Sequence, residues 1–289
     1  MNTIPVTIIS GYLGAGKTTL VNHLLRNPAG KRLAILVNDF GDLPIDADLI
    51  EAQDDDLISL SGGCVCCSYG SGMVEAFLKL KSFDPMPDHV ILEASGVAIP
   101  SAITGSLSIM DGFHLDGVIC LVDAPQIQHQ FANCYLADTI EQQFAGSDIL
   151  LLNKIDLLAE DEQEQLIDWL ENIASGTAIL RTRFAAVDTE LLLRPFDRSE
   201  DNGRSKHDHR DENYHTDIII PSDPIEPETF VQNVLKNYPD LLRAKGFVLT
   251  PEGEMKTIQI VGKRADISSA PINAKPGVVV ISLNNSGSH

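Results

Sequence analysis

Short apolar runs and amphipathic stretches alternate through the larger, N-terminal part of the chain. The runs at 3–10, 32–39, 88–94, 116–124 and 148–154 are nearly continuous in aliphatic residues. Helical patterns lie beside them, at 17–27, 72–83 and 161–173. Continuous apolar strands separated by helices are typical of a parallel sheet that is covered on both faces. The pattern therefore predicts a doubly wound α/β domain with a mostly parallel sheet, which would bind ligands at the carboxyl ends of its strands.

The alternation stops at a polar segment. Residues 194–217 are charged and nearly free of aliphatic side chains, which indicates a linker or surface loop. Beyond this segment, about four strand-like runs and a helix-like stretch predict a smaller α+β domain. We therefore expect an α/β domain over residues 1–190, a linker over 191–217 and the α+β domain over 218–289.

Charge and composition narrow the range of partners. The 289 residues carry a formal net charge of −20, from 21 basic and 41 acidic side chains. This excess of acid disfavours nucleic acid and anionic membrane surfaces as partners. No apolar run has the length of a membrane span, and the N-terminal residues lack the basic start of a signal peptide. We expect a cytoplasmic protein, in which thiols stay reduced.

The segment "GYLGAGKTT", residues 11–19, matches the phosphate-binding pattern G-x-x-x-x-G-K-[ST]. It follows a predicted strand and opens a predicted helix, as the pattern requires. Backbone N–H groups would surround the phosphates, Lys17 would reach the β- and γ-phosphates, and the Thr18 hydroxyl would bind Mg²⁺. The nucleotide-binding residues expected here are Gly11, Gly14, Ala15, Gly16, Lys17, Thr18 and Thr19.

A second motif indicates the base. Asn153, Lys154 and Asp156 form N-K-x-D at the end of the apolar run 148–154. An aspartate carboxylate can accept hydrogen bonds from both the N1–H and the exocyclic amine of guanine, a pair that adenine does not offer. A site built for such a pair discriminates strongly, because the wrong base leaves buried polar groups unsatisfied. The motif therefore predicts GTP as the nucleotide.

Glu93 ends the apolar run 88–94, and the turn "ASGVAIP" overlaps and follows it. A carboxylate at the carboxyl end of a strand can hold the magnesium shell or orient the attacking water. Gly96, within the turn, can bring a backbone N–H close to the γ-phosphate. We expect Lys17, Thr18 and Glu93 to carry catalysis by positioning and by stabilising charge on the γ-phosphate.

Three of the five cysteines crowd together in "GGCVCCS", as Cys64, Cys66 and Cys67. Neighbouring cysteines are poorly placed to bridge each other, whereas thiolates bind zinc and similar cations well. Three ligands leave a coordination position open, which suits a site that loads and releases metal. Redox-active thiols and plain buried cysteines are the alternatives. For Cys120 and Cys134 we expect core or incidental roles.

Five segments, in this order along the chain, resemble the CobW-type P-loop GTPases: "GYLGAGKTTLVNHLL", "VNDFGDLPIDADLI", "LSGGCVCCS", "ILEASGVAIP" and "LLNKIDLL". This family is related to the urease and hydrogenase accessory GTPases. The resemblance covers most of residues 4–185, and the cysteine motif is its most specific mark. It implies a GTP-hydrolysing metallochaperone that delivers a transition metal to a client protein. Zinc is the default for cysteine ligands, with Co²⁺ or Ni²⁺ open, and GTP-dependent homodimers are frequent among the relatives.

The resemblance also points to Asp39, as a carboxylate that contacts the transferred metal or Mg²⁺. The family commonly has N-E-x-G at this point, so the shorter aspartate is a departure from its pattern. The polar linker contains His207, His209 and His215. These histidines are either weak metal ligands or part of a solvated loop.

Two rival functions belong to other classes. The first is a regulatory module that senses GTP together with metal or redox state, with hydrolysis only as a reset. A stable client complex in the GTP state, without metal transfer, would favour it. The second is a kinase, which would place the phosphate on a small acceptor. The N-K-x-D and cysteine motifs together disfavour the kinase.

Overall fold

The computed structural model describes residues 3–37, 58–61, 71–193, 214–271 and 274–283. The chain separates into two compact units, residues 1–193 and 194–289. The residues expected to bind a transition metal lie outside the described residues, namely Asp39, Cys64, Cys66 and Cys67. His207 and His209 also lie outside them.

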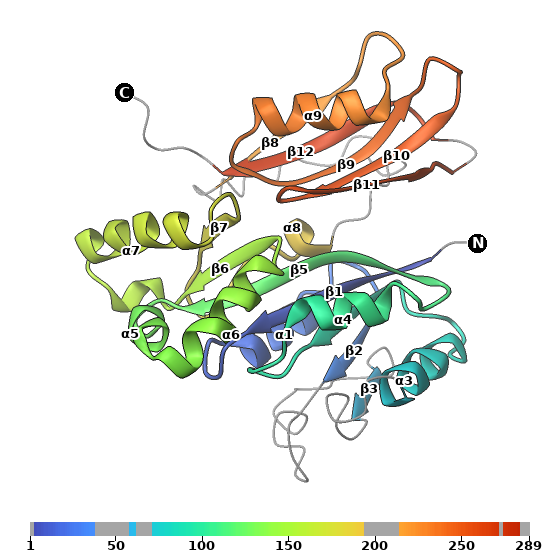
Figure 1. Cartoon of the computed structure of the whole chain (residues 1–289). Helices are drawn as coiled ribbons and strands as arrows, with labels where there is room; N and C mark the ends of the chain where they lie inside the picture. The colour runs from blue at the N-terminus through green and yellow to red at the C-terminus, as the bar shows by residue number, and fades with distance from the viewer. Residues whose placement is uncertain (1–2, 38–57, 62–70, 194–213, 272–273, 284–289) are drawn as a thin grey trace. The chain divides into compact units, whose positions relative to one another are not determined.

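The first unit is built on a seven-stranded sheet with the order β3-β2-β4-β1-β5-β6-β7 (Figure 1). Its strands are β1 Ile4–Gly11, β2 Leu33–Val37, β3 Ile58–Ser61, β4 His89–Glu93, β5 Phe113–Asp123, β6 Ile149–Asn153 and β7 Ala178–Arg181. Neighbouring strands run parallel throughout. The predicted α/β fold is confirmed. The apolar pattern does not predict the edge strands β3 and β7, which have only four residues each.

Helices connect the strands of this unit. They are α1 Lys17–Arg26, α3 Ser71–Lys81, α4 Pro100–Leu107, α5 Ile127–Ala132, α6 Cys134–Ala145, α7 Glu160–Ile173 and α8 Thr189–Leu193, with the 3-10 turn η1 Ile155–Leu157. The strands β2, β4 and β6 are buried along their whole length. Because successive side chains of a strand point to opposite faces, such strands are covered on both faces.

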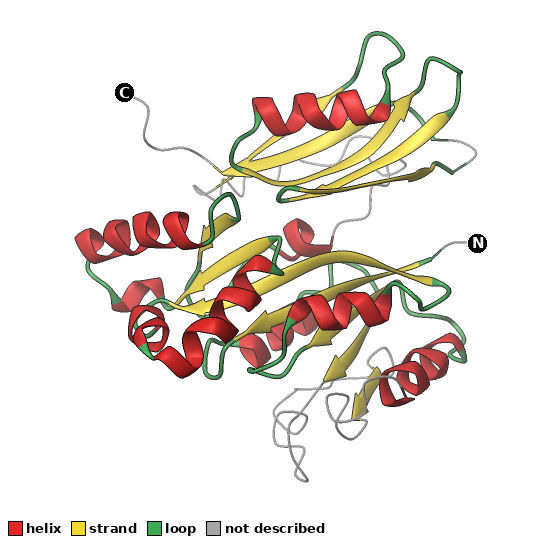
Figure 2. Ribbon diagram, viewed as in Figure 1, coloured by secondary structure: helices red, strands yellow, loops and turns green. Residues whose placement is uncertain are grey.

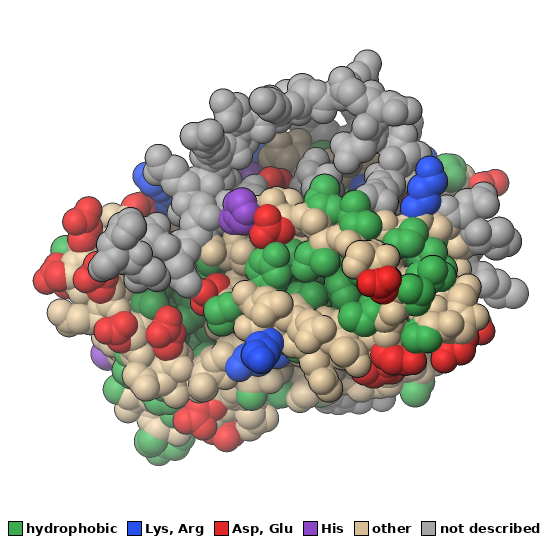
Figure 3. All heavy atoms as spheres, turned by 90° about the horizontal axis from the view of Figure 1, so that it is seen from above, with side chains coloured by type: hydrophobic (Ala, Val, Ile, Leu, Met, Phe, Trp, Pro, Cys, Tyr) green, Lys and Arg blue, Asp and Glu red, His purple; other side chains and the backbone are tan. Residues whose placement is uncertain are grey.

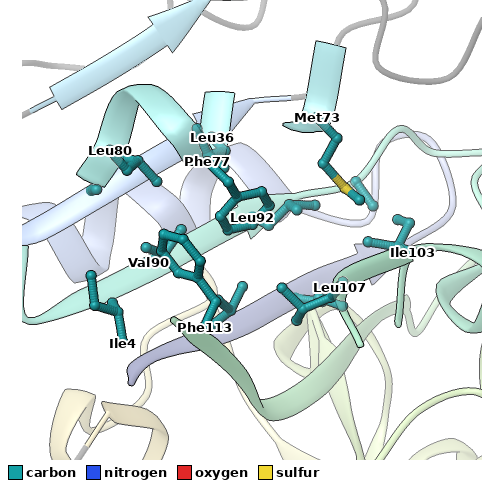
Figure 4. Packing of buried hydrophobic residues seen from close by; sticks show 14 of the residues in the cluster. Ile4, Leu36, Met73, Phe77, Leu80, Val90, Leu92, Ile103, Leu107 and Phe113 are labelled. Atoms are coloured by element: carbon teal, nitrogen blue, oxygen red, sulfur yellow. The ribbon is translucent and has the colours of Figure 1, made fainter. Parts of the chain in front are cut away.

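One core cluster lies between the sheet and the helices α3 and α4 (Figure 4). Phe77 of α3 meets Phe113 of β5 edge to face, with ring centroids 4.6 Å apart. Met73 and Leu80 line the same face of α3 at helical spacing. A second cluster joins α5, α6 and α7 to β5 and β6. Burial of these apolar side chains holds the strands in place beneath the loops at their carboxyl ends.

The second unit combines a five-stranded antiparallel sheet, order β11-β10-β9-β12-β8, with the helix α9 (Figure 2). The elements are β8 Tyr214–Ile219, α9 Pro227–Asn237, β9 Leu241–Leu249, β10 Met255–Val261, β11 Arg264–Ser269 and β12 Gly277–Leu283. Phe230, Val231 and Val234 of α9 pack on the sheet.

The predicted α+β class of this unit is confirmed. Its sheet has one strand more than the apolar runs indicate, because β11 has the polar sequence "RADISS" and is largely exposed. The strand β8 begins within the segment 191–217 that the composition predicts to be a linker. Its side chains at 215 and 216 are exposed and polar, so they give no apolar signal.

Acidic side chains are scattered over the face of the molecule that Figure 3 shows, among apolar and polar ones. This distribution agrees with the net charge of −20. Across the described ranges, no helix combines the length and the apolar character that crossing a membrane requires.

Candidate nucleotide-binding site

The predicted phosphate loop lies between the end of β1 and the start of α1. The strand β1 sits between β4 and β5 in the sheet order. The chain runs from β1 into β2 and β4 on one side of it and then crosses to β5 and β6 on the other. Doubly wound sheets bind ligands outside the carboxyl ends of the strands at such a reversal. The loop therefore lies at the carboxyl edge of the sheet where folds of this class usually bind a ligand.

Two glycines give the loop its shape. Gly11 has φ +127° and Gly16 has φ +107°, values that residues with side chains rarely adopt. A Cβ on Gly11 would overlap the carbonyl oxygen of Leu121, and one on Gly16 would lie 2.5 Å from Asn153 Nδ2. Gly16 is also the N-cap of α1, so the partial positive charge of that helix end meets the loop.

Lys17 folds back across the loop. Its Nζ donates hydrogen bonds to the carbonyl oxygens of Gly11 at 3.0 Å and Tyr12 at 3.3 Å. Its side chain is buried. The ammonium group is thereby held beside the main chain that would surround the phosphates, where its charge can act on the β- and γ-phosphate oxygens.

Thr18 meets the carboxylate at the end of β4. Its Oγ1 donates a hydrogen bond to Glu93 Oε1 at 2.9 Å, and the Glu93 side chain is only 3% exposed. A hydroxyl that donates its proton keeps its oxygen lone pairs, so Thr18 can still serve as a ligand. Hydroxyl and carboxylate oxygens are the ligands that Mg²⁺, a hard cation, prefers. The structure thus brings together two of the residues predicted to carry catalysis.

The turn after β4 packs against the phosphate loop. Gly96 is buried, and a Cβ there would lie 2.5 Å from Leu13 Cδ2 and 2.9 Å from Leu13 N. The turn is closed by a hydrogen bond from Ala98 N to Ser95 O at 2.9 Å. On its other side, Gln143 Nε2 of α6 donates to Gly96 O and Ala98 O, both at 3.1 Å. The close approach to Leu13 explains why glycine stands at position 96.

Asn153 links the phosphate loop to the loop after β7. Its Nδ2 donates to Ala15 O at 2.9 Å, and its Oδ1 accepts from Ala185 N at 2.9 Å. The residue is buried, with 2% of its surface exposed. Both polar atoms of the amide are bonded inside the protein, so Asn153 holds the phosphate loop and the loop after β7 together.

Lys154 and Asp156 occupy the turn that follows β6. Lys154 adopts φ +62°, and its Nζ lies 2.6 Å from Asp123 Oδ2 at the end of β5. Asp156 is exposed within the 3-10 turn η1. An exposed carboxylate in this turn is free to meet a ligand from solvent, whereas the lysine is already paired with a nearly buried acid.

The remaining candidates for metal chemistry differ in character. Cys120 is buried in β5, and burial raises the pKa of its thiol to about 12, while Cys134 is exposed at the start of α6. His215 Nε2 lies 2.9 Å from Asp217 Oδ1 in β8. Within the part of the chain that the structure describes, no group of three or more His, Cys, Asp or Glu side chains could hold a metal ion. The described cysteines therefore agree with the core or incidental roles expected for them.

Among the described residues, contacts to the site also come from Asp123, Gln143 and Ala185, which no motif names. Asp123 ends an apolar run, so its place at the carboxyl edge of the sheet could be inferred from the sequence. Gln143 lies in a helix and Ala185 in a loop, and neither has a local pattern that marks it.

The sequence is similar to a described protein family and to several characterised proteins. Residues 5–181 match the family described as CobW/HypB/UreG, nucleotide-binding domain. The chain is 28% identical to "Zinc chaperone CobW" from Sinorhizobium sp, over 91% of this chain and 86% of that protein. It is 32% identical to "Zinc chaperone YjiA" from Escherichia coli (strain K12), over 67% of this chain and 62% of that protein. It is 28% identical to "Zinc-regulated GTPase metalloprotein activator 1" from Schizosaccharomyces pombe, over 66% of this chain and 49% of that protein.

Proposed function

The chain belongs to the CobW/HypB/UreG family of P-loop GTPases, and from this premise we propose that it is a cytosolic metallochaperone that couples GTP hydrolysis to the transfer of a transition metal. The relatives named zinc chaperones support zinc as the cargo. The relative named a metalloprotein activator supports a client metalloprotein as the recipient. Co²⁺ and Ni²⁺ are the alternative cargoes, because thiolate sites bind these cations as well.

The hydrogen bond between Thr18 and Glu93 is the observation that carries the hydrolytic half of the proposal. It connects the first turn of α1 to the end of β4. We propose that the γ-phosphate binds beside this bond. Thr18 and Glu93 would hold Mg²⁺, directly and through its water shell. A bound Mg²⁺ would neutralise charge on the β- and γ-phosphate oxygens.

The other steps fall to the protein itself. Lys17 stabilises the charge that develops on the γ-phosphate, and Glu93 orients the attacking water. Gly96 presents its backbone N–H to the γ-phosphate. Because all these groups are held before the nucleotide arrives, little reorganisation accompanies the reaction. We expect slow turnover unless metal or a partner stimulates it.

The base end of the site supports GTP over ATP. Asp156 is exposed in η1, where its carboxylate can accept both hydrogen bonds from guanine. Asn153, which precedes this turn, is fixed by its buried hydrogen bonds with Ala15 and Ala185. The nucleotide-binding set that we propose is Gly11, Gly14, Ala15, Gly16, Lys17, Thr18, Thr19, Gly96, Asn153, Lys154 and Asp156.

The cargo site is proposed at Cys64, Cys66 and Cys67, with Asp39 as an additional carboxylate. Three thiolates hold zinc firmly and leave a coordination position through which a client can take the ion. GTP with Mg²⁺ would set the geometry around the three cysteines, and hydrolysis would relax that geometry and release the metal. We propose a GTP-bound homodimer as the loaded form.

GTP hydrolysis by chelator-stripped protein tests the coupling. The rate is measured with and without one equivalent of Zn²⁺ for the wild type, for Cys66→Ser and for Cys134→Ser as a matched control. Cys134 is an exposed cysteine outside the proposed cargo site. We expect Zn²⁺ to change the rate of the wild type and of Cys134→Ser, and to leave the rate of Cys66→Ser unchanged.

The contrary result is equally clear. If Zn²⁺ changes no rate and does not co-elute with the wild type, the cysteines carry no cargo. The chain would then be a GTPase whose clustered thiols sense redox state, and peroxide treatment of Cys66→Ser would test that alternative.

A further inference from the structure

Helix α6 reaches the turn after β4 through a single buried side chain. Gln143 is 1% exposed, and its Nε2 donates to the carbonyl oxygens of Gly96 and Ala98, both at 3.1 Å. A primary amide nitrogen has two hydrogens, and each of them has an acceptor here. Both partners are carbonyls, so only the nitrogen end of the amide can face them. The chemistry of the partners therefore fixes the orientation of the amide.

The same turn is held from other directions. Leu13 of the phosphate loop packs so closely on Gly96 that no Cβ fits there. The C-terminal end of α6 also approaches the start of α4, since a Cβ on Gly146 would lie 3.2 Å from Pro100 Cβ. The segment from Gly96 to Pro100 is thus enclosed by the phosphate loop on one side and by α6 on the other.

Two hydrogen bonds to a turn of this size constrain its main chain. A peptide unit is planar, so fixing the direction of a carbonyl also fixes the N–H of the next residue. The two bonds therefore fix the N–H groups of Val97 and Ile99 and restrict the dihedral angles of Val97 and Ala98. The Gly96 N–H lies in the same peptide unit as the Ser95 carbonyl, which accepts from Ala98 N at 2.9 Å, so the constraint extends to that N–H. The turn can then change conformation only if Gln143 releases its carbonyls or α6 moves with it.

We propose that Gln143 is a positioning residue for the γ-phosphate end of the site. It holds the Gly96 turn in the conformation that receives the γ-phosphate, and it links α6 to the presence of that phosphate. The inference deepens the proposed function and rests on the role assigned there to Gly96. The α- and β-phosphates and the base meet other groups, so GDP binding does not depend on Gln143.

Replacement of the amide by a thioether of similar length tests the proposal. Gln143→Met removes the donor and keeps the bulk. Gln142→Met is the matched control, because Gln142 is the neighbouring residue on the same helix. Its Nε2 donates a hydrogen bond to Asp138 Oδ2 at 2.8 Å on the exposed surface. The dissociation constants for GDP and for a non-hydrolysable GTP analogue are measured with Mg²⁺, together with kcat.

For Gln143→Met we expect weaker binding of the analogue and a lower kcat, each by roughly 10-fold, the effect of two lost hydrogen bonds. GDP affinity should stay within about twofold, and Gln142→Met should match the wild type in all three quantities. Gln143→Glu, which keeps the size and polarity but loses the donors, should show the same selective loss.

If Gln143 only stabilises the fold, its variants should lose affinity for GDP as well as for the GTP analogue. If both Gln143 variants lose GDP and analogue affinity equally, by misfolding or otherwise, or if they behave as Gln142→Met does, the proposal is overturned. These measurements use nucleotide without transition metal. A wild type that ignores Zn²⁺ would therefore defeat the metallochaperone proposal and leave the role of Gln143 standing.

Discussion

The two ends of the nucleotide site are built by different means. At the phosphate end, the shape of the loop 11–18 depends on Gly11 and Gly16, where a Cβ would clash with neighbouring atoms. At the base end, the side chains of Asn153 and Lys154 contact three other segments, at Ala15, Ala185 and Asp123. A methyl group is therefore enough to disrupt the phosphate end, whereas the base end should respond to the exchange of a single oxygen for a nitrogen.

The largest effect is expected where the two ends touch. Gly16→Ala places a Cβ 2.5 Å from Asn153 Nδ2 at a residue with φ +107°. Because the substitution strains the loop and displaces the amide that holds Ala15, kcat/KM for GTP should fall by at least ~100-fold. Steady-state hydrolysis measures it.

Gly14→Ala is the matched comparison within the same loop. Gly14 also has a positive φ, of +78°, but a Cβ there would meet nothing within 4 Å. The fall in kcat/KM for GTP should be clearly smaller for Gly14→Ala than for Gly16→Ala, because Gly14→Ala adds backbone strain and no clash. Equal losses in the two variants would mean that contact with Asn153 does not matter.

The next effect isolates the base end. Asp156→Asn replaces one of the two acceptor oxygens of this exposed side chain in η1 by a donor. Guanine offers two donors to this position, so GTP affinity should fall by about 100-fold. Xanthine carries a carbonyl in place of the exocyclic amine, and XTP should therefore bind the variant better than GTP does. Competition binding with GTP, XTP and ATP measures the base preference of the variant. If Asp156→Asn still prefers GTP, Asp156 does not contact the base.

The third effect isolates the phosphate end. Glu93→Gln keeps the size of the side chain that accepts from Thr18 but removes its charge. We expect kcat to fall by about 10- to 100-fold with little change in KM, because the charge acts on the reacting phosphate. Single-turnover hydrolysis across a Mg²⁺ titration measures it.

Substitutions of Thr18 sharpen this third comparison. Thr18→Ser retains the hydroxyl that bonds Glu93 and should retain most of the activity, whereas Thr18→Val should behave as Glu93→Gln does. If Thr18→Val hydrolyses GTP as the wild type does, the hydroxyl has no part in the reaction.

The smallest effect concerns the support of the base turn. Asp123→Asn weakens the partly buried ion pair with Lys154, whose atoms lie 2.6 Å apart. The expected result is a loss of GTP affinity of roughly threefold to tenfold with kcat unchanged, in the range of one ordinary hydrogen bond. Glu254→Gln, in the exposed pair with Lys256, should leave nucleotide affinity unaltered. If Asp123→Asn lowers kcat more than it lowers GTP affinity, Asp123 acts on the reacting phosphate and not on the turn that binds the base.

Local pattern predicts much of this site. The phosphate loop, Glu93 and the N-K-x-D turn each follow an apolar run, so their place at the carboxyl edge of a parallel sheet can be inferred from the sequence. The bond between Thr18 and Glu93 joins residues 75 positions apart. It brings together two side chains that the motifs had selected one by one.

Spacing alone reveals neither Gln143 nor Ala185. Gln143 contacts Gly96 across 47 positions, and Ala185 contacts Asn153 across 32. The apolar pattern also omits β3, β7 and β11, since the first two are very short and the third is polar and largely exposed. Whether such segments pair depends on the neighbour that the fold presents to them.

The sequence by itself determined the α/β class and the nucleotide chemistry, and it predicted the side chains that would carry that chemistry. Periodicity and motif spacing are signals within short windows of sequence, so they can be recognised without the distant parts of the chain. Tertiary structure alone decided which supports reach those side chains, as when Asn153 bonds Ala15 across 138 positions. Hydrogen bonds of this kind depend on strand order and register, because these place residues within ~3 Å that the chain keeps far apart.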